Sequence, residues 1–292
     1  MENINKFKSM KNIIVPLDFS LDALKGLDLA LLIAAKTPVK IQMVYVQKKT
    51  DVPSNSEEEF KYAEKHFKKI IEEFRNKVPK ESSLTFIIKK GKVYQEIVSQ
   101  AQAFQDSIIV ASTHGASGFE ELFIGSNAHR IISATSRPVI TIRQTPVPAN
   151  ITKIILPIDI VVESRQKVIF TALLAQIFGA EIHVITVSSS KSKKITSRLN
   201  AYSQQVCNYL KTREISFKTS SLHGDKVIKM VLEYAEKEKA ELISIINESG
   251  DSITDYIIGG EAQQMISKSP VPVLTIRAKP HFIKDSFSTF GE

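Results

Sequence analysis

The sequence predicts an α/β protein made of two tandem copies of a doubly wound, mostly parallel five-stranded sheet with helices on both faces. Two observations predict this class. Short apolar runs alternate with segments of helical periodicity along the whole 292-residue chain. The chain also repeats itself, because KNIIVPLDF at 11–19 returns as TKIILPIDI at 152–160. A repeat of this kind indicates two domains of one fold.

The ends of the two copies match as well. The segment SRPVITIR at 136–143 returns as SPVPVLTIR at 269–277. We therefore expect one domain over residues 1–146, a second over 150–278 and a loose tail over 279–292. The TPVP segment at 145–148 is expected to be a stiff linker, because proline fixes the backbone.

Each element of the first copy has a signal of its own. Short apolar runs are typical of strands covered on both faces, and they lie at 13–17, 39–46, 84–88, 107–111 and 139–143. Helical spacing predicts two long helices whose core-facing residues are Leu21, Leu24, Leu27, Leu31 and Ala35 in one, and Phe60, Ala63, Phe67, Ile70, Ile71 and Phe74 in the other. Shorter helices are expected at 94–104 and 127–134.

Two helix starts carry capping residues. Ser20 is placed to cap the first helix. Ser56 and Glu59 have the spacing of a capping box, so the second helix is expected to begin there, after a polar loop over 51–56.

The second copy repeats this order. Its strands are expected at 154–158, 181–187, 217–221, 242–246 and 273–277, with a long helix over 193–212. Cys207 lies in the apolar stripe of that helix and is expected to be a buried core thiol.

Composition narrows the class of protein. The net charge is +8, with acids and bases mixed in both halves. Nucleic-acid binders concentrate basic residues on one face, so no nucleic-acid partner is expected. The longest strictly apolar run, 29–35, is far shorter than the roughly 20 residues of a membrane helix. No apolar signal segment follows the first residues, so we expect a cytoplasmic protein without membrane contact. One cysteine excludes an internal disulfide and a multi-cysteine zinc site.

A ligand site is expected at the carboxyl ends of the strands, where the order of an open parallel sheet reverses. Leu17 and Asp18 end the first strand, Val46 ends the second, and a glycine-rich stretch over 112–127 follows the fourth. Backbone amides at the start of the helix near Ser126 attract an anion. The glycines alone support two interpretations equally, a phosphate cradle and a plain turn with a helix cap.

Several reaction classes find no support in the sequence. It has no P-loop, no complete dinucleotide fingerprint, no His-Glu-x-x-His or Gly-x-Ser-x-Gly motif and no kinase signature. His114 has no evident catalytic partner and is expected to stabilise its loop. The six histidines lack metal-ligand spacing, so no metal site within the protein is expected.

The matching pieces together resemble the universal stress protein family, in a tandem two-domain form. These pieces are VPLDFS at 15–20, THG at 113–115, GS at 125–126 and RPVITI at 137–142. The resemblance covers both copies. It implies a Rossmann-like fold of the adenine-nucleotide alpha hydrolase type.

The resemblance also implies a site for ATP or a related adenine nucleotide, with Mg²⁺ as counter-ion. Asp18 and Val46 would frame the base next to Leu17. The residues around the sugar and phosphates would be Ser112, Gly115, Gly125, Ser126 and Asn127. Ser112 departs from the family motif, which has glycine there, and its side chain either crowds the ribose or bonds to it.

The second copy departs further from the motif. When Gly259 is aligned with Gly125, Ile246 and Ser249 replace the two glycines and Gly260 replaces the serine. Glu248 adds a negative charge that opposes a phosphate. A shift by one residue, to Gly250 and Gly260, restores the motif spacing and spoils the neighbouring match. We expect a degenerate site, because only the first copy is expected to bring a glycine loop to a helix start.

Two functions follow as alternatives. The first is a regulatory protein that binds an adenine nucleotide in its first domain and is at most a weak ATPase. The second is a ligand-free interaction scaffold of the stress response. The last strand of each copy follows a proline and is a natural sheet edge. The resemblance implies that these strands pair the two copies into a pseudo-dimer within one chain, with a homodimer of whole chains as a further option.

Overall fold

A computed structural model of the protein describes residues 9–47, 53–113, 125–143, 145–247 and 259–278. These residues belong to two compact units, and the division between Val147 and Pro148 falls inside the expected linker. We call Ser9–Val147 the first domain and the unit that contains the residues after Val147 the second domain. Each has the α/β architecture that the sequence predicts.

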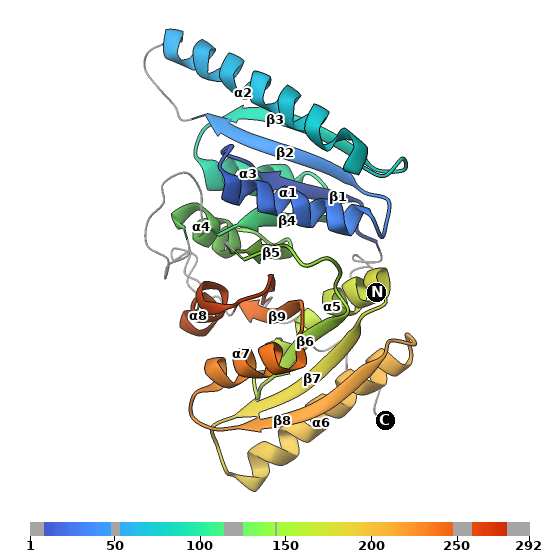
Figure 1. The fold of residues 1–292 in the computed structure, drawn as a ribbon. Helices are drawn as coiled ribbons and strands as arrows, with labels where there is room; N and C mark the ends of the chain where they lie inside the picture. Colours follow the sequence, from blue (N-terminus) through green and yellow to red (C-terminus); the bar gives the residue numbers. More distant parts are fainter. Residues whose placement is uncertain (1–8, 48–52, 114–124, 144, 248–258, 279–292) are drawn as a thin grey trace. The chain divides into compact units, whose positions relative to one another are not determined.

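The first domain alternates strands and helices in the expected order. Its described strands are β1 (Asn12–Pro16), β2 (Lys40–Gln47), β3 (Ser83–Lys90), β4 (Ser107–Ser112) and β5 (Val139–Ile142). Its described helices are α1 (Leu21–Ala34), α2 (Pro53–Phe74), α3 (Val93–Gln102) and α4 (Ser126–Ala134), with a 3-10 turn, η1 (Arg75–Lys77), after α2. The strands are parallel and lie in the order β3-β2-β1-β4-β5 (Figure 1).

This strand order explains the double winding. Because β1 lies between β2 and β4, the chain leaves β1 first in one direction and then in the other. Right-handed crossovers therefore put α1 and α2 on one face of the sheet and α3 and α4 on the opposite face. The contacts agree, since α2 packs on β2 and β3 while α3 packs on α4. The reversal between β1 and β4 marks the edge where ligands bind in such sheets.

Helix α1 buries a different stripe from the expected one. Leu27 and Leu31 are buried, but Leu21 is 83% exposed and Ala35 is also exposed. The stripe against the sheet instead includes the small residues Ala23, Gly26, Ala30 and Ala34. Small side chains allow the helix to approach the strands closely. Leu21 is the first helical residue, and this stripe leaves it on the solvent side.

Helix α2 begins earlier than the capping-box interpretation predicts. It starts at Pro53, so Ser56 and Glu59 lie within it and the expected box is wrong. Proline is favourable at a first helical position because its missing N–H has no helical partner there. The carbonyl oxygen of Ser56 accepts a 2.8 Å hydrogen bond from Gln47 Nε2. Phe60, expected in the core, is 45% exposed.

The second domain has the same topology. Its described strands are β6 (Lys153–Ile158), β7 (Glu181–Ser188), β8 (Phe217–His223), β9 (Leu242–Asn247) and β10 (Val273–Arg277), parallel and in the order β8-β7-β6-β9-β10. Its described helices are α5 (Lys167–Phe178), α6 (Lys193–Lys211), α7 (Val227–Glu238) and α8 (Gly260–Lys268), with a 3-10 segment, η2 (Val162–Gln166), before α5. Cys207 on α6 is only half-buried, so the expectation of a core thiol is wrong.

Candidate functional site

Seven of the eight residues expected at the site line a single cavity of the first domain. They come from the ends of three strands and the start of one helix, and they are Leu17, Asp18, Val46, Ser112, Gly125, Ser126 and Asn127. The eighth, Gly115, lies outside the described residues. The cavity lies at the carboxyl ends of β1, β2 and β4, where the strand order reverses.

The turn after β1 holds Asp18 at the mouth of this cavity. The amide of Leu17 donates to the carbonyl oxygen of Val44, 2.9 Å away, and continues the pairing with β2. The Asp18 Oδ1 atom accepts from the amide and the hydroxyl of Ser20, at 3.1 and 2.6 Å. The Ser20 hydroxyl in turn accepts from the amide of Ala23 and caps α1, as expected. Ser20, and not Asp18, therefore caps the helix. Asp18 is exposed and lines the cavity.

The start of α4 presents backbone donors to the same cavity. Gly125 is the N-cap residue, and no side chain hydrogen-bonds to the cap. Ser126, Asn127 and Ala128 form the first turn and line the cavity. Amides of a first turn have no partner within their helix, and they lie at the positive end of its dipole. This arrangement suits an anion such as a phosphate.

Ser112, the departure from the family motif, fits into the sheet without closing the cavity. It is the last residue of β4, paired in register with Ile142 of β5. The cavity remains beside it and has Ser112 in its lining.

The sequence did not single out Tyr45 or Phe19, and both belong to the surroundings of the site. Tyr45 lines the cavity, and its hydroxyl donates to Glu59 Oε1 at 2.8 Å. Burial, together with that hydrogen bond, raises the pKa of Tyr45 above its ordinary value. The Phe19 ring stacks on Tyr45 with centroids 5.0 Å apart. The strand predicted at 39–46 placed Tyr45 on the sheet but gave no sign of these contacts.

A second cavity lies at the corresponding ends of β6, β7 and β9. It encloses about 220 Å³, against about 150 Å³ for the first, so volume does not distinguish the two. Their linings do. The second has Asp159, Lys167 and Glu261 among mainly apolar residues, which include Val187, Val227, Val231, Ile245, Ile246 and Met265.

Two residues make the second cavity chemically different from the first. Ile246 occupies the position of Ser112 and lines the cavity with a branched apolar side chain. Lys167 stands where the repeat has Gly26 and is only 2% exposed. A Cβ on Gly26 would lie 3.4 Å from the carbonyl oxygen of Val110, so the first domain has close backbone packing where the second has a long cationic side chain. The two copies are offset by 141 positions, which places Lys167 at the position of Gly26, and this offset is the sequence signal that could have identified Lys167.

The two helix starts, by contrast, are alike. Gly259 is the N-cap of α8, with φ −53° and ψ 140°, against −53° and 142° for Gly125. This supports the alignment of these two glycines. A glycine at the helix start is therefore common to both copies, whereas the expectation that only the first copy brings a glycine loop there concerns residues outside those described. Ser249, Glu248 and Gly250, used in the same comparison, lie outside the described residues.

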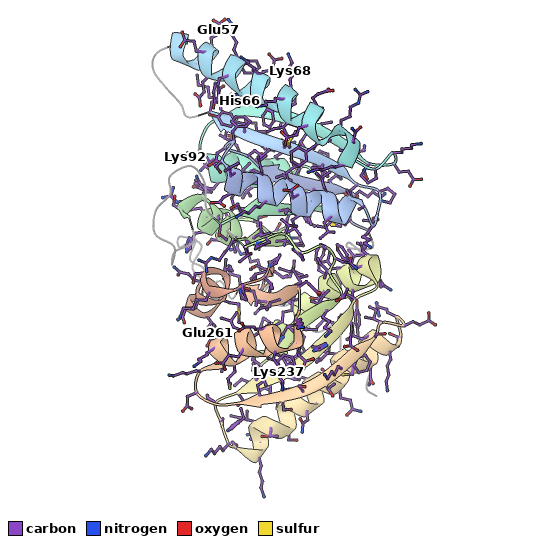
Figure 2. All side chains as sticks on the ribbon, in the orientation of Figure 1. Glu57, His66, Lys68, Lys92, Lys237 and Glu261 are labelled. Carbon is purple, nitrogen blue, oxygen red and sulfur yellow. The ribbon has the colours of Figure 1, made fainter. Side chains whose placement is uncertain are left out.

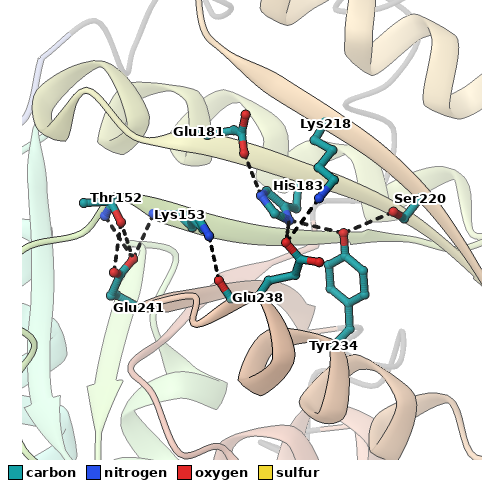
Figure 3. Close-up of polar contacts among 9 residues, drawn as sticks. All are labelled: Thr152, Lys153, Glu181, His183, Lys218, Ser220, Tyr234, Glu238 and Glu241. Atoms are coloured by element: carbon teal, nitrogen blue, oxygen red, sulfur yellow. Dashed lines mark hydrogen bonds and ion pairs between the residues drawn. The ribbon is translucent and has the colours of Figure 1, made fainter.

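A polar network of the second domain lies away from that domain's cavity, around the fully buried His183 of β7 (Figure 3). Its Nε2 atom is 2.8 Å from Glu181 Oε1, and its Nδ1 atom is 3.2 Å from the Tyr234 hydroxyl. Lys218 Nζ donates to Glu238 Oε2 at 3.2 Å, on the same side of the sheet. Since Glu181 and His183 are near the amino end of β7, this network is remote from the carboxyl ends that form the cavity.

The described part of the chain has no helix suited to a membrane and no cluster suited to a metal ion. None of its helices combines the length and the apolar character needed to cross a bilayer. Within the same residues, no group of three or more histidine, cysteine, aspartate or glutamate side chains is placed to hold a metal ion.

Comparison with known proteins gives a consistent family. The sequence profile of the universal stress protein family matches residues 10–143 and 150–277, one match in each domain. The universal stress protein YxiE of Bacillus subtilis (strain 168) is 27% identical over 146 residues, which are 44% of this chain and 97% of that protein.

Solved structures share the fold of the whole chain. A universal stress protein from Archaeoglobus fulgidus DSM 4304 has a TM-score of 0.75 at 20% identity, covering 91% of this chain and 98% of the other. A functionally unknown protein from Pseudomonas aeruginosa PAO1 has a TM-score of 0.65 at 16% identity, covering 94% and 95%. At these identities the likeness establishes the tandem fold.

Proposed function

Because the chain belongs to the universal stress protein family, we propose that it is a stress regulator whose first domain binds ATP or a related adenine nucleotide. One observation carries the proposal. A carboxylate at the end of β1 and an N-terminal helix turn without a side-chain cap border the same cavity at the reversal of strand order. The carboxylate suits the amino group of a base, and the helix turn suits phosphates.

The residues present fit such a ligand from end to end. Asp18 would accept from the base, with Leu17 and Val46 as apolar neighbours. Ser112 would lie against the ribose. The amides and hydroxyl at Ser126 would donate to phosphate oxygens, and Mg²⁺ would balance the remaining phosphate charge. Any hydrolysis would be slow, because the described cavity lining holds a single carboxylate, Asp18, and no histidine, lysine or arginine.

The second domain, in this proposal, is structural. Ile246 removes the polar wall that Ser112 gives the first cavity, and Glu261 puts an acidic side chain in the first turn of α8, where the first cavity has Asn127. The sheet core is nevertheless intact, with Ile154, Leu156 and Leu242 fully buried. Pairing of the two domains through β5 and β10 stays a prediction. Small-angle scattering tests it, and two lobes without contact would contradict it.

Calorimetric titration of the full chain with ATP, ADP, AMP and cyclic AMP tests the proposal. We expect one nucleotide per chain, and a higher melting temperature at saturation because the ligand binds only the native state. Asp18→Ala should weaken binding, whereas Asp159→Ala should leave it unchanged. Two nucleotides per chain, or a loss confined to Asp159→Ala, would contradict the assignment to the first domain.

The alternative, a ligand-free interaction scaffold, is favoured by one observation. Ser112 carries a side chain where the family motif has glycine, and it lines the cavity. No heat of binding and no thermal shift at millimolar ATP would support this alternative. Recovery of binding in Ser112→Gly would then identify Ser112 as the cause.

A further inference from the structure

Phe19 has a left-handed backbone, with φ +66°, which is uncommon for an aromatic residue. Two other described non-glycine residues have positive φ, Glu214 and Lys239. Lys239 is the C-cap of α7, and Glu214 follows the end of α6, where left-handed residues are common. Phe19 lies instead in the turn from β1 into α1, so helix termination does not explain its conformation.

The fold itself does not require this conformation. The second domain makes the same turn with Asp159, Ile160 and Val161. Val161 has φ −74°, its amide donates to Asp159 Oδ1 at 2.7 Å, and Ile160 is not among the residues with positive φ. The turn at Asp159 in the second domain is therefore an internal control for the left-handed conformation of Phe19. The strained residue belongs to the turn beside the proposed nucleotide cavity, where backbone strain is a sign of function.

The Phe19 ring is held by aromatic side chains of two neighbouring elements. Its centroid lies 5.0 Å from Tyr45 of β2 and 5.0 Å from Phe67 of α2. His66 is 5.2 Å away, and Tyr62 is 6.0 Å away (Figure 2 labels His66 on α2). These contacts fix the ring between β2 and α2, and the fixed ring offsets the strain of the left-handed backbone.

The same turn orients Asp18. Phe19 is the middle residue between Asp18 and Ser20, and the Asp18 carboxylate accepts from both the amide and the hydroxyl of Ser20. The turn at Asp159 makes the corresponding amide bond without a left-handed residue, but Val161 has no hydroxyl to donate. In the first domain the φ angle of Phe19 helps to set where both Ser20 donors lie relative to the carboxylate. A turn that loses the ring contacts can relax, and the carboxylate then changes direction.

We propose that Phe19 is a positioning residue that aims Asp18 at the base of the bound nucleotide and so sets the preference for adenine over guanine. The inference rests on the proposed function. Adenine carries an amino donor at the position where guanine carries a carbonyl oxygen. A carboxylate held in one direction accepts from the amino group and repels the carbonyl oxygen, whereas a carboxylate free to turn discriminates less.

The test compares dissociation constants of ATP and GTP, with melting temperatures, for the wild-type chain and four variants. Phe19→Leu keeps an apolar side chain and loses the ring, and we expect the GTP-to-ATP ratio of dissociation constants to fall by about tenfold. Phe19→Tyr keeps the ring and should keep the ratio. Phe86→Leu is the stability control, because Phe86 stacks on Phe67 at 4.6 Å, one ring further from Asp18, and it should leave the ratio unchanged.

His66→Ala serves if Phe19→Leu does not fold, because His66 is only half-buried and its loss removes one ring contact. It should lower the ratio by a smaller factor. A Phe19→Leu variant with the wild-type ratio would overturn the role of Phe19 and leave nucleotide binding intact. The same holds for His66→Ala where that variant is used instead. A wild-type chain that binds neither nucleotide would overturn the proposed function itself.

Discussion

The carbonyl oxygen of Thr113 accepts a 2.7 Å hydrogen bond from the amide of Gly125. The bond ties the end of β4 to the residue that begins α4. The carbonyl oxygen of Gly125 accepts in turn from the amide of His129, 3.0 Å away, in the first hydrogen bond of that helix. Gly125 thus fixes the position at which the first helical turn opens onto the cavity.

Replacement of Gly125 by valine should abolish nucleotide binding. Gly125 lines the cavity, and a branched side chain there would compete with the phosphates for space. Its backbone, at φ −53° and ψ 142°, is accessible to any residue, so the fold should persist. Calorimetric titration with ATP measures the loss, and circular dichroism checks the fold. The matched control is Gly259→Val, at the same helix position of the second domain, which should bind ATP as the wild type does. Equal losses in both variants would contradict a site in the first domain.

The affinity for ATP should fall as the side chain at position 112 becomes larger. Ser112→Ile copies Ile246 of the second domain and should weaken ATP binding by about tenfold or more. Ser112→Gly restores the family motif and should bind at least as tightly as the wild type. An isoleucine variant with wild-type affinity would show that this position does not exclude nucleotide from the second cavity.

Truncation of Phe67 should destabilise the first domain. Phe67 is fully buried and contacts the rings of Phe19 and Phe86. Phe67→Ala should cost about 3–5 kcal/mol in the free energy of unfolding, through lost burial and the cavity left behind. Phe60→Ala is the control on the same helix, because Phe60 is 45% exposed. It should change the free energy of unfolding by only about 0.5 kcal/mol. Urea unfolding of both variants compares them, and similar losses would contradict the packing described for α2.

The Lys218–Glu238 pair should make stability depend on pH at both ends of the scale. The hydrogen bond from Lys218 lowers the pKa of Glu238, so this contribution is complete above the ordinary carboxyl pKa and is lost as the pH falls through the lowered one. The same bond raises the pKa of Lys218, so the contribution is complete below the ordinary lysine pKa and is lost as the pH rises through the raised one.

Lys218→Met should therefore flatten the curve of unfolding free energy against pH below about pH 4.5, the ordinary value for a glutamate. High salt should reduce the difference, because Lys218 is exposed. Lys229→Met is the control, since Lys229 pairs with Glu233 at 3.4 Å where both side chains are more than 60% exposed. A Lys218 variant with the wild-type acid slope would show that the pair does not contribute to stability.

The fold was readable from the sequence because it depends on local and periodic signals. A parallel strand covered on both faces must be apolar throughout, so runs such as Ile13–Val15 stand out, and the repeat doubled each signal. The site followed from topology, since the carboxyl ends of neighbouring strands meet at one edge. The sequence therefore predicts Leu17, Asp18 and Ser126 at one edge of the sheet, and the three residues line one cavity there.

What the sequence did not predict depends on contacts between distant segments. The exposure of Leu21 follows from which face of α1 approaches the sheet, and that choice is made by Ala23 and Gly26 together with the strands beneath them. The left-handed Phe19 depends on rings from β2 and α2. No local propensity favours that conformation in an aromatic residue.

The central position of β1 has a consequence for synthesis of the protein. Asn12 Nδ2 donates to Asp106 Oδ1 at 2.7 Å, 94 positions later, and β4 begins at the next residue. A nascent chain that has not yet reached β4 carries β1 with one edge unpaired, although β2 and β3 are already complete. Such an edge invites wrong partners until translation supplies the right one. The cavity between β1 and β4 also needs the first turn of α4, so it cannot form before Ala128 has been translated, and a fragment that ends before Ser107 would lack both β4 and the cavity.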